Sequence, residues 1–313
     1  MEKPPKTSQR HGQITKALKD VAKDLGKAPN DVYNQFFREV FLHELMRHHS
    51  GWVLKGGTNV YCRIPGARQT KDLDLYRQDS PTSAAEAADA LVAALDGHRV
   101  GPYVFRIAPY GGTEKLGTIE SKRLMVTVTH GINNTLLSFG VDVSGDLRVS
   151  SAVETLNVAA SYEVRTEFLP QTFQVVSYPV ANQIADKVCA MYERHGKQPP
   201  GRASTRYHDL FDIALLASEL PETTRLSAHE LDAALASQSE VRELRLPRQL
   251  TLPDETWVNE YSAKAKRFNN GVRPELENLD TALEVAGLLV TPVLSGQMKN
   301  SSKTWSSAAL SWS

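Results

Sequence analysis

Hydrophobic positions recur with a helical period in the first part of the chain. Apolar residues return every three or four positions in residues 14–25 and again in residues 30–45. Both segments are predicted to be helices that pack together. Residues 82–96 carry an Ala/Leu stripe behind a Thr or Ser cap, which predicts a further helix.

Alternation replaces the helical period in the next part of the chain. Residues 52–54 form a short apolar run, and Leu73 and Leu75 alternate with Asp72 and Asp74. Both patterns are typical of strands. Longer strands are predicted at residues 103–110, 123–130 and 135–145, the last two joined as a hairpin. Helices together with these strands indicate an α+β fold.

From Pro179 onward the pattern is almost wholly helical. Helices are predicted at residues 179–195, 206–220, 227–237, 254–268 and 274–289. We therefore expect an α+β domain over residues 13–178 and a helical domain over residues 179–291. The polar residues 1–12 are expected to be a flexible tail, and the serine-rich residues 292–313 a disordered one.

Composition and charge narrow the setting in which the protein works. Lys plus Arg and Asp plus Glu both number 36, so a nucleic-acid contact would have to come from a local basic patch. The two cysteines, Cys62 and Cys189, form no CxxC pair and are expected to be core thiols in a reducing cytoplasm. No run of eighteen apolar residues is present, so we expect no membrane span.

Two acidic residues near a glycine pair are the first candidates for chemistry. In a strand, residues two apart share one face, so Asp72 and Asp74 project together while the intervening leucines face the core. Two carboxylates on one face repel unless a hard cation lies between them. Mg²⁺, which prefers oxygen ligands, fits this arrangement.

Further residues extend this candidate site. Asp142 lies between two valines in the predicted strand 135–145, which could pair beside the strand that carries the first two acids. Gly56 and Gly57 let the backbone N–H groups approach a phosphate, and Thr58 adds a hydroxyl at the start of the following helix. The pattern predicts glycines that cradle phosphates and carboxylates that hold metal.

The order of these motifs resembles the DNA polymerase β-like nucleotidyltransferase superfamily. The segments LKGGT, TKDLDL, ADK at 185–187 and RYHDLFDI at 206–213 together resemble the AbiEii/AbiGii-type nucleotidyltransferase toxins, including the MenT-like proteins, over residues 30–290. The resemblance implies a polymerase β-like sheet domain followed by an all-helical domain. It also implies a Mg²⁺-dependent toxin of a toxin–antitoxin or phage-defence system that transfers NMP from an NTP to the tRNA 3′ end and blocks translation.

The resemblance also implies a role for individual residues. Magnesium would be held by Asp72, Asp74 and Asp142; the triphosphate would contact Lys55, Gly56, Gly57, Thr58, Lys187 and Arg206; and Asp209 would complete the last acidic motif. Many relatives carry Arg directly before that last acid, where this chain has His208. Arg206 lies two positions earlier, about 200° around a helix, so its reach to the phosphates is left open.

Expected partners follow from the same resemblance. They are an NTP, with CTP or GTP favoured, the tRNA acceptor end and a cognate antitoxin, and we expect a monomer. Basic residues in the segments 194–206 and 264–267 are candidates for acceptor contacts. An antitoxin could act by docking or by phosphorylating Thr70, two residues before Asp72, where added negative charge would enter the site.

Other interpretations stay open or are excluded at this point. A small-molecule nucleotidyltransferase, similar to antibiotic adenylyltransferases, would show no salt-steep RNA affinity. A non-catalytic GTP-binding regulatory module would bind NTP without incorporating it. A zinc-protease interpretation of HELMRHH fails because Arg47 stands four residues after His43. We expect Asp212 to be structural, and a Lys187→Ala change to weaken NTP use with the fold intact.

Overall fold

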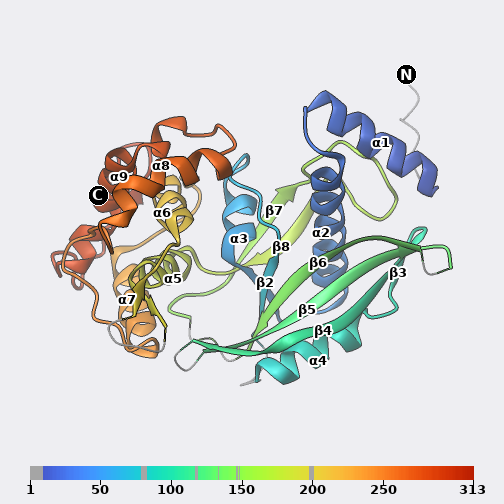
Figure 1. Cartoon of the computed structure of the whole chain (residues 1–313). Coiled ribbons are helices and arrows are strands. Elements are labelled where there is room, and N and C mark those ends of the chain that lie inside the picture. Colours follow the sequence, from blue (N-terminus) through green and yellow to red (C-terminus); the bar gives the residue numbers. More distant parts are fainter. Residues whose placement is uncertain are drawn as a thin grey trace.

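The chain divides into a half built on a β-sheet and a half built from helices (Figure 1). The computed structural model describes residues 10–78, 83–116, 119–132, 134–145, 147, 149–196 and 201–313. The sheet half precedes the helical half in the sequence, and the second begins with the helix at Val180. The result is a mixed α/β fold with a central mixed sheet and helices.

Eight strands form the central sheet. In chain order they are β1 (Trp52–Lys55), β2 (Leu73–Arg77), β3 (Arg99–Val100), β4 (Tyr103–Leu116), β5 (Ile119–His130), β6 (Asn134–Ser144), β7 (Glu154–Ala159) and β8 (Thr172–Ser177). Their order in space is β3-β4-β5-β6-β2-β1-β8-β7. The β2–β6 and β1–β8 pairs are parallel and the other pairs are antiparallel. The predicted pairing of strand 135–145 beside DLDL is therefore present.

One face of the sheet is apolar and is covered by helices. The helices of this half are α1 (His11–Asp24), α2 (Pro29–His48), α3 (Gly56–Arg63) and α4 (Ala84–Leu95). Phe41 of α2 packs edge-on against Phe105 and Phe139 of the sheet, with ring centroids 5.4 and 5.7 Å apart. Leu75 and Val143 are fully buried in the same cluster. Because side chains alternate along a strand, their neighbours Asp74 and Asp142 lie on the opposite face.

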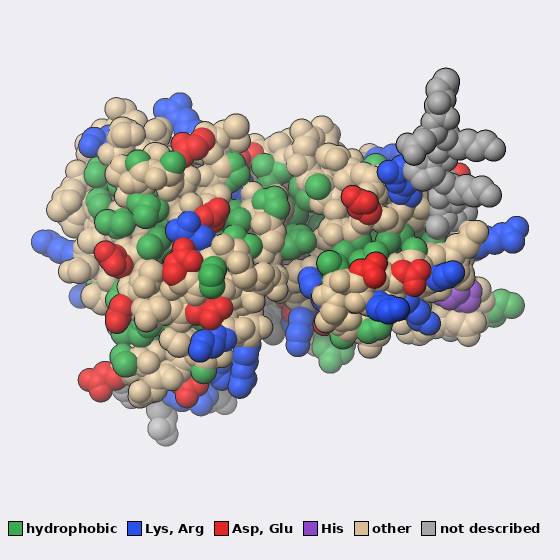
Figure 2. Space-filling model, turned by 90° about the horizontal axis from the view of Figure 1, so that it is seen from above, with side chains coloured by type: hydrophobic (Ala, Val, Ile, Leu, Met, Phe, Trp, Pro, Cys, Tyr) green, Lys and Arg blue, Asp and Glu red, His purple; other side chains and the backbone are tan. Residues whose placement is uncertain are grey.

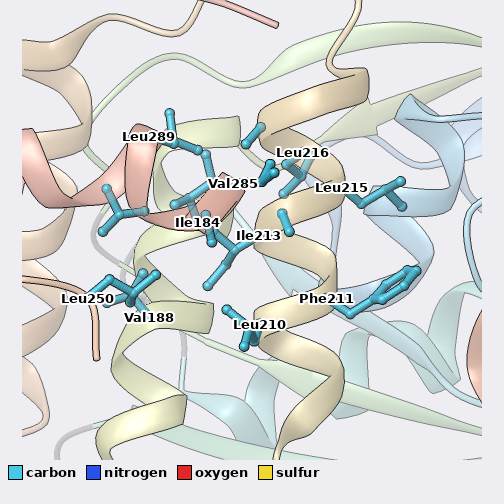
Figure 3. Close-up of a cluster of buried hydrophobic side chains, with 14 of the residues drawn as sticks. Ile184, Val188, Leu210, Phe211, Ile213, Leu215, Leu216, Leu250, Val285 and Leu289 are labelled. Carbon is cyan, nitrogen blue, oxygen red and sulfur yellow. The ribbon is translucent and has the colours of Figure 1, made fainter. Parts of the chain in front are cut away.

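The helical half packs around α5 and α6. Its elements are α5 (Val180–Tyr192), β9 (Arg194–His195), β10 (Arg202–Ala203), α6 (Tyr207–Glu219), α7 (Ala228–Val241), α8 (Thr256–Phe268), the 3₁₀ helix η1 (Pro274–Glu277), α9 (Leu279–Leu294), β11 (Trp305–Ser306) and β12 (Ser311–Trp312). Figure 3 shows Ile184 and Val188 of α5 facing Leu210 and Ile213 of α6, with Leu289 of α9 above them. The all-helical expectation is not confirmed, because the short hairpin β9–β10 joins α5 to α6 and a second short hairpin, β11–β12, follows α9.

The chain ends do not follow the predicted tails. Residues 1–9 of the expected N-terminal tail lie outside the described residues, and α1 already begins at His11. At the other end, residues 292–313 were expected to be disordered, and this is wrong. Trp305 and Trp312 face each other across the β11–β12 hairpin, and their indole N–H groups donate to the carbonyl oxygens of Ala217 and Leu289. Two buried indoles anchor a segment whose serine content alone indicates disorder.

Within the described ranges, no helix is both long enough and apolar enough to cross a bilayer.

Cys189 is fully buried and Cys62 is half-buried, and both are free thiols. Burial raises the pKa of each thiol to about 12, so neither is a reactive thiolate near neutral pH.

Candidate active site

A cavity of about 590 Å³ lies between the polar face of the sheet and the start of the helical half. Its walls come from β1, β2, β5, β6, the loop before β2, helices α3, α5 and α6, and the C-terminal end of α7. It is lined by Lys55, Gly56, Gly57, Arg68, Gln69, Thr70, Lys71, Asp72, Asp74, Ser121, Asp142, Ser144, Gln183, Asp186, Lys187, Ala190, Glu193, Arg206, His208 and Arg242. Eight of the ten residues predicted from the sequence line this one cavity, and Thr58 and Asp209 do not.

Strand register places four charged residues in one row across the sheet. Lys55 of β1 stands opposite Asp74 of β2, Asp74 opposite Asp142 of β6, and Asp142 opposite Arg123 of β5. Directly opposite residues share a face and have adjacent Cβ atoms. The row therefore consists of two adjacent carboxylates with a cation at each end. The amine of Lys55 also donates to the hydroxyl of Ser144 at 2.8 Å.

Asp72 joins this row from the loop that leads into β2. Its Oδ1 lies 2.6 Å from Nη2 of Arg123, whose Nη1 lies 3.6 Å from Oδ2 of Asp142. One guanidinium thus spans two carboxylates, one from the loop before β2 and one from β6. Gly140 makes room for it, because a Cβ there would stand 2.6 Å from Nη2 of Arg123 and 2.7 Å from Oδ1 of Asp72. The side chains of Asp72 and Asp142 are 38% and 28% exposed.

The glycine pair lies where β1 ends and α3 begins. Gly56 has φ of +67°, which favours glycine, and a Cβ at this position would lie 1.9 Å from Oδ2 of Asp74. A Cβ on Gly57 would lie 2.3 Å from a methyl group of Thr70. Lys55 at the N-cap makes no side-chain capping bond, so the first N–H groups of α3 have no side-chain cap. These donors and the positive end of the helix dipole favour an anion here.

Thr58 has a different position from the one expected. Its side chain is buried and does not line the cavity. The Thr58 hydroxyl lies 2.7 Å from the Thr70 hydroxyl and 3.3 Å from the Asp72 carbonyl oxygen, and the Thr70 hydroxyl donates to that same carbonyl at 3.0 Å. Thr58 therefore holds the loop that carries Asp72, and its hydroxyl is engaged with Thr70 and the Asp72 carbonyl instead of facing the cavity.

Cations from two elements meet two acids of α6 on the helical wall of the cavity. The amine of Lys187 on α5 donates to Asp209 at 3.0 Å and to Asp212 at 2.6 Å, and both acids lie on α6. Arg68, from the loop before β2, makes a two-pronged contact with Asp212 through Nε at 2.8 Å and Nη2 at 2.7 Å. Both aspartates have no exposed surface. They fix the cations and do not face the cavity themselves.

Electrostatics separate these buried acids from the acid of the sheet. Burial alone would raise the pKa of Asp209, but the charges of Lys187 and Arg206 outweigh it and hold this pKa well below its usual value. Burial would also raise the pKa of Asp212, but the charges of Arg68 and Lys187 outweigh it and lower this pKa. At Asp74 burial dominates over the nearby cations, so its pKa is raised. The buried acids of α6 are therefore firmly ionised.

Arg206 reaches the cavity although it is displaced along the sequence. It is the N-cap residue of α6, its Nε lies 2.5 Å from Oδ2 of Asp209, and its side chain is 49% exposed. His208 also lines the cavity, and burial lowers its pKa to about 4, so it is neutral at physiological pH. Arg206 thus contacts Asp209 from the cap position and lines the cavity, and its contact with the phosphates stays a prediction.

The far end of the helical wall holds a second charged cluster. Arg242, after α7, donates to Asp186 at 2.8 Å and to Glu193 at 2.7 Å. All three residues line the cavity. Burial lowers the pKa of Arg242, but the two carboxylates raise it by a larger amount. The pKa is therefore raised overall, and this arginine stays charged. The cluster ties the end of α5 to α7 beside the cavity.

The carboxylates of the sheet fit a hard divalent cation. In the described part of the chain, no three His, Cys, Asp or Glu side chains already form a closed metal-binding group. The guanidinium of Arg123 lies between Asp72 and Asp142, so these two carboxylates do not contact each other directly. The donor set consists of carboxylate oxygens only, which is the set that Mg²⁺ prefers. Gly56 and Gly140 also lack the Cβ atoms that would crowd Asp74 and Asp72.

Basic side chains border the cavity on the helical half. Figure 2 shows Lys and Arg side chains gathered at the edge of this half, beside the indentation between the two halves. Arg194 and Arg202 lie on the exposed β9–β10 hairpin that leads from α5 to α6, and Lys197 lies outside the described residues. In the second predicted segment, Lys264 pairs with Glu260 at 3.7 Å on α8.

Sequence reasoning missed three residues of the site. Arg123 and Arg242 contact the cavity acids Asp72 and Asp186, and Arg68 contacts the buried Asp212, from elements whose position depends on the tertiary fold. For Arg123 a signal was present, since it opens the predicted strand 123–130 that pairs with the strand of Asp142. Arg68 lies in a loop and Arg242 beyond a helix end, and neither position carries a periodic pattern.

Comparison with known proteins gives the family. The family model described as "Nucleotidyl transferase AbiEii toxin, Type IV TA system" matches residues 41–285. Among solved structures, the nucleotidyltransferase toxin MenT4 from Mycobacterium tuberculosis H37Rv is similar, with a TM-score of 0.55 and 16% identity over 92% of this chain and 90% of that one. At this identity the likeness concerns the fold alone.

Two structures from Helicobacter pylori are also similar. JHP933 has a TM-score of 0.48 and 18% identity over 86% of this chain and 95% of that one, and a putative nucleotidyltransferase has 0.46 and 17% over 84% and 97%. The search of curated proteins found no match. The family match covers the glycine pair, the row of sheet charges and the cations of the helical wall. The chain belongs to the AbiEii family of nucleotidyltransferase toxins of type IV toxin–antitoxin systems.

Proposed function

We propose that this toxin transfers the nucleotidyl group of an NTP, CTP or GTP by preference, to the 3′ end of tRNA and so blocks translation. One observation carries the proposal: two adjacent strand carboxylates, Asp74 and Asp142, face a cavity whose other wall presents cations. Such an arrangement suits phosphoryl transfer, which depends on positioning and charge neutralisation more than on covalent chemistry. Family membership supports a nucleotide substrate and a cognate antitoxin.

The triphosphate would lie between the start of α3 and the helical wall. Backbone N–H groups after Gly56 and the amine of Lys55 would donate to it from the sheet side. Arg206, with about half of its side chain exposed, can extend to the phosphates while Asp209 holds its Nε. Lys187 is only 5% exposed, so it would act chiefly through its charge. Asp209 and Asp212 position these cations and do not touch substrate.

Magnesium would be held by Asp72, Asp74 and Asp142. When bound, a divalent cation neutralises triphosphate charge and lowers the pKa of an attached oxygen nucleophile. We assign proton uptake to the carboxylate of Asp142, which is 28% exposed to the cavity. The acceptor 3′-hydroxyl gives its proton to this carboxylate, its oxygen bonds to the α-phosphorus, and the α–β phosphoanhydride bond breaks. Pyrophosphate leaves on the side of Lys187 and Arg206.

The acceptor would approach along the basic edge beside the cavity. Arg194 and Arg202 on the exposed β9–β10 hairpin, which directly follows the cavity residue Glu193, would contact the nucleic-acid backbone. Each phosphate contact releases counterions, so affinity for tRNA should fall steeply with salt. The salt slope is therefore a direct measure of this surface.

Incorporation of label tests the proposal. Purified protein is incubated with total tRNA, Mg²⁺ and each α-³²P-labelled NTP separately, and the RNA is resolved on a denaturing gel. We expect labelled tRNA from the wild type and from Asp89→Asn, a change at an exposed position on α4, and none from Asp72→Asn. Equal labelling by Asp72→Asn would contradict the assigned role of this residue.

The same assay separates the other activities. Label found on a small molecule, with no salt-dependent tRNA binding, would replace the proposal with a small-molecule nucleotidyltransferase. NTP binding by calorimetry with no label on any acceptor would replace it with a non-catalytic nucleotide-binding module.

A further inference from the structure

Arg123 occupies the space between two of the carboxylates assigned to the metal. Its Nη2 lies 2.6 Å from Asp72 and its Nη1 lies 3.6 Å from Asp142, and a third atom, Nε, would lie 3.0 Å from a Cβ at Gly140. The guanidinium therefore fills the room that the missing side chain of Gly140 provides. It stands opposite Asp142 in the row of charges that crosses the sheet.

A purely stabilising role does not account well for this position. The side chains of Arg123 and Asp72 are 35% and 38% exposed, and ion pairs in such surroundings contribute little to stability. The same contact has a large consequence for a ligand. Two carboxylates that share a guanidinium are no longer both available to a cation, and the cation would also meet the positive charge of the arginine.

We propose that Arg123 is a built-in counter-cation that takes the place of the divalent ion in the metal-free protein and must be displaced before the ion binds. This inference rests on the proposed metal site. It deepens that proposal by assigning a residue that sets the order of binding. The free ion competes with Arg123 at a disadvantage, whereas the ion that arrives on a nucleotide brings triphosphate charge with which the displaced guanidinium can pair.

Binding of Mn²⁺ without nucleotide tests the inference. Free Mn²⁺ is followed by electron paramagnetic resonance as protein is added, and no turnover is required. Arg123→Gln removes the competitor and its charge, so we expect Mn²⁺ affinity to rise roughly five-fold or more, the lower end of typical coupling between sites. The matched control is Arg106→Gln, at an exposed position on neighbouring β4 outside the cavity, which should leave the affinity unchanged.

A second variant keeps the test valid if Arg123→Gln does not fold. Arg123→Lys retains the charge but cannot span two carboxylates with one planar fork, so its Mn²⁺ affinity should lie between those of the wild type and the glutamine variant. Weaker or unchanged Mn²⁺ binding in both Arg123 variants would overturn the inference while leaving the metal site in place. A wild type that binds no Mn²⁺ even with NTP present would overturn the proposed function itself.

Discussion

Aspartates lie on both sides of the cavity, but their surroundings are opposite. Asp209 and Asp212 of α6 have no exposed surface and are enclosed by cations, whereas Asp72 and Asp142 of the sheet side are 38% and 28% exposed. The pKa values of the α6 acids are lowered and that of Asp74 is raised. Acids paired with buried cations fix the wall of the site, whereas Asp72 and Asp142 face the cavity and share the partly exposed guanidinium of Arg123.

Loss of one sheet carboxylate should separate activity from stability. Asp72→Asn removes a charge that would stabilise the transition state by several kcal/mol, so transfer should fall by about three orders of magnitude. Stability should change by no more than about 1 kcal/mol, because the ion pair with Arg123 is exposed. Single-turnover transfer and urea unfolding measure the two quantities. A large loss of stability would mean that Asp72, like Asp209 and Asp212, mainly stabilises the fold.

Loss of the buried cation should, in contrast, strongly reduce stability. Lys187→Met leaves Asp209 and Asp212 buried with less compensation, so the free energy of unfolding should fall by about 3–5 kcal/mol. The sequence alone predicts that replacement of Lys187 weakens NTP use and leaves the fold intact, whereas the buried ion pairs predict a large loss of stability. Urea unfolding provides the measurement, with Lys264→Met in an exposed pair on α8 as the matched control.

A double variant identifies the origin of that loss. Adding Asp212→Asn to Lys187→Met removes one of the stranded charges, so the combined loss should be smaller than the sum of the single losses by about 0.5–3 kcal/mol. Additive losses would mean that Lys187 and Asp212 do not stabilise each other.

Acid should affect the two groups of aspartates in opposite directions. The lowered folded-state pKa values of Asp209 and Asp212 supply stability that is complete above about pH 4, the unfolded-state value, and is lost as the pH falls below it. The raised pKa of Asp74 makes the folded state take up a proton more readily, so its protonation favours folding as the pH falls.

Variants should resolve these two contributions. Between pH 5 and pH 3 the stability of Asp212→Asn should fall less steeply than that of the wild type, by up to about 1.4 kcal/mol per pH unit for one carboxylate. The stability of Asp74→Asn should fall more steeply than that of the wild type. Unfolding by urea at a series of pH values measures both slopes, and parallel curves would contradict the assignment.

The smallest expected effect concerns Thr58. Thr58→Val keeps the shape and removes the hydroxyl that bonds to Thr70, so stability should fall by about 1 kcal/mol. The KM for NTP should stay within about two-fold of the wild type, because the side chain does not line the cavity. A ten-fold rise in KM at unchanged stability would restore the role that the family resemblance implies.

The pairing of the sheet acids could be predicted from the sequence because strands have a period of two. Asp74 and Asp142 each stand between apolar residues, which fixes the face of each side chain, and the hydrophobic pattern then fixes the register. Lys187 and Asp209 were found through the motifs of the family resemblance. Local patterns of this kind do not require knowledge of the tertiary fold.

The remaining features could not be predicted in this way. Arg68 reaches Asp212 across 144 residues of sequence, and the α6 acids reveal their buried role only when α5 and the loop before β2 pack on them. Trp305 and Trp312 stand in a serine-rich segment without periodicity, and their hydrogen bonds are to distant residues of α6 and α9. Composition predicts disorder there because it does not account for two large anchors.

The central claim is that the carboxylates of Asp72, Asp74 and Asp142 hold a divalent ion beside a nucleotide. A crystal structure with Mn²⁺ and a non-hydrolysable NTP tests it most directly, since anomalous scattering locates the ion. We predict a manganese peak within coordination distance of these carboxylates, triphosphate oxygens against the start of α3, and Arg123 moved from its place between Asp72 and Asp142. A nucleotide bound elsewhere, or no ion among the three carboxylates, would contradict the account.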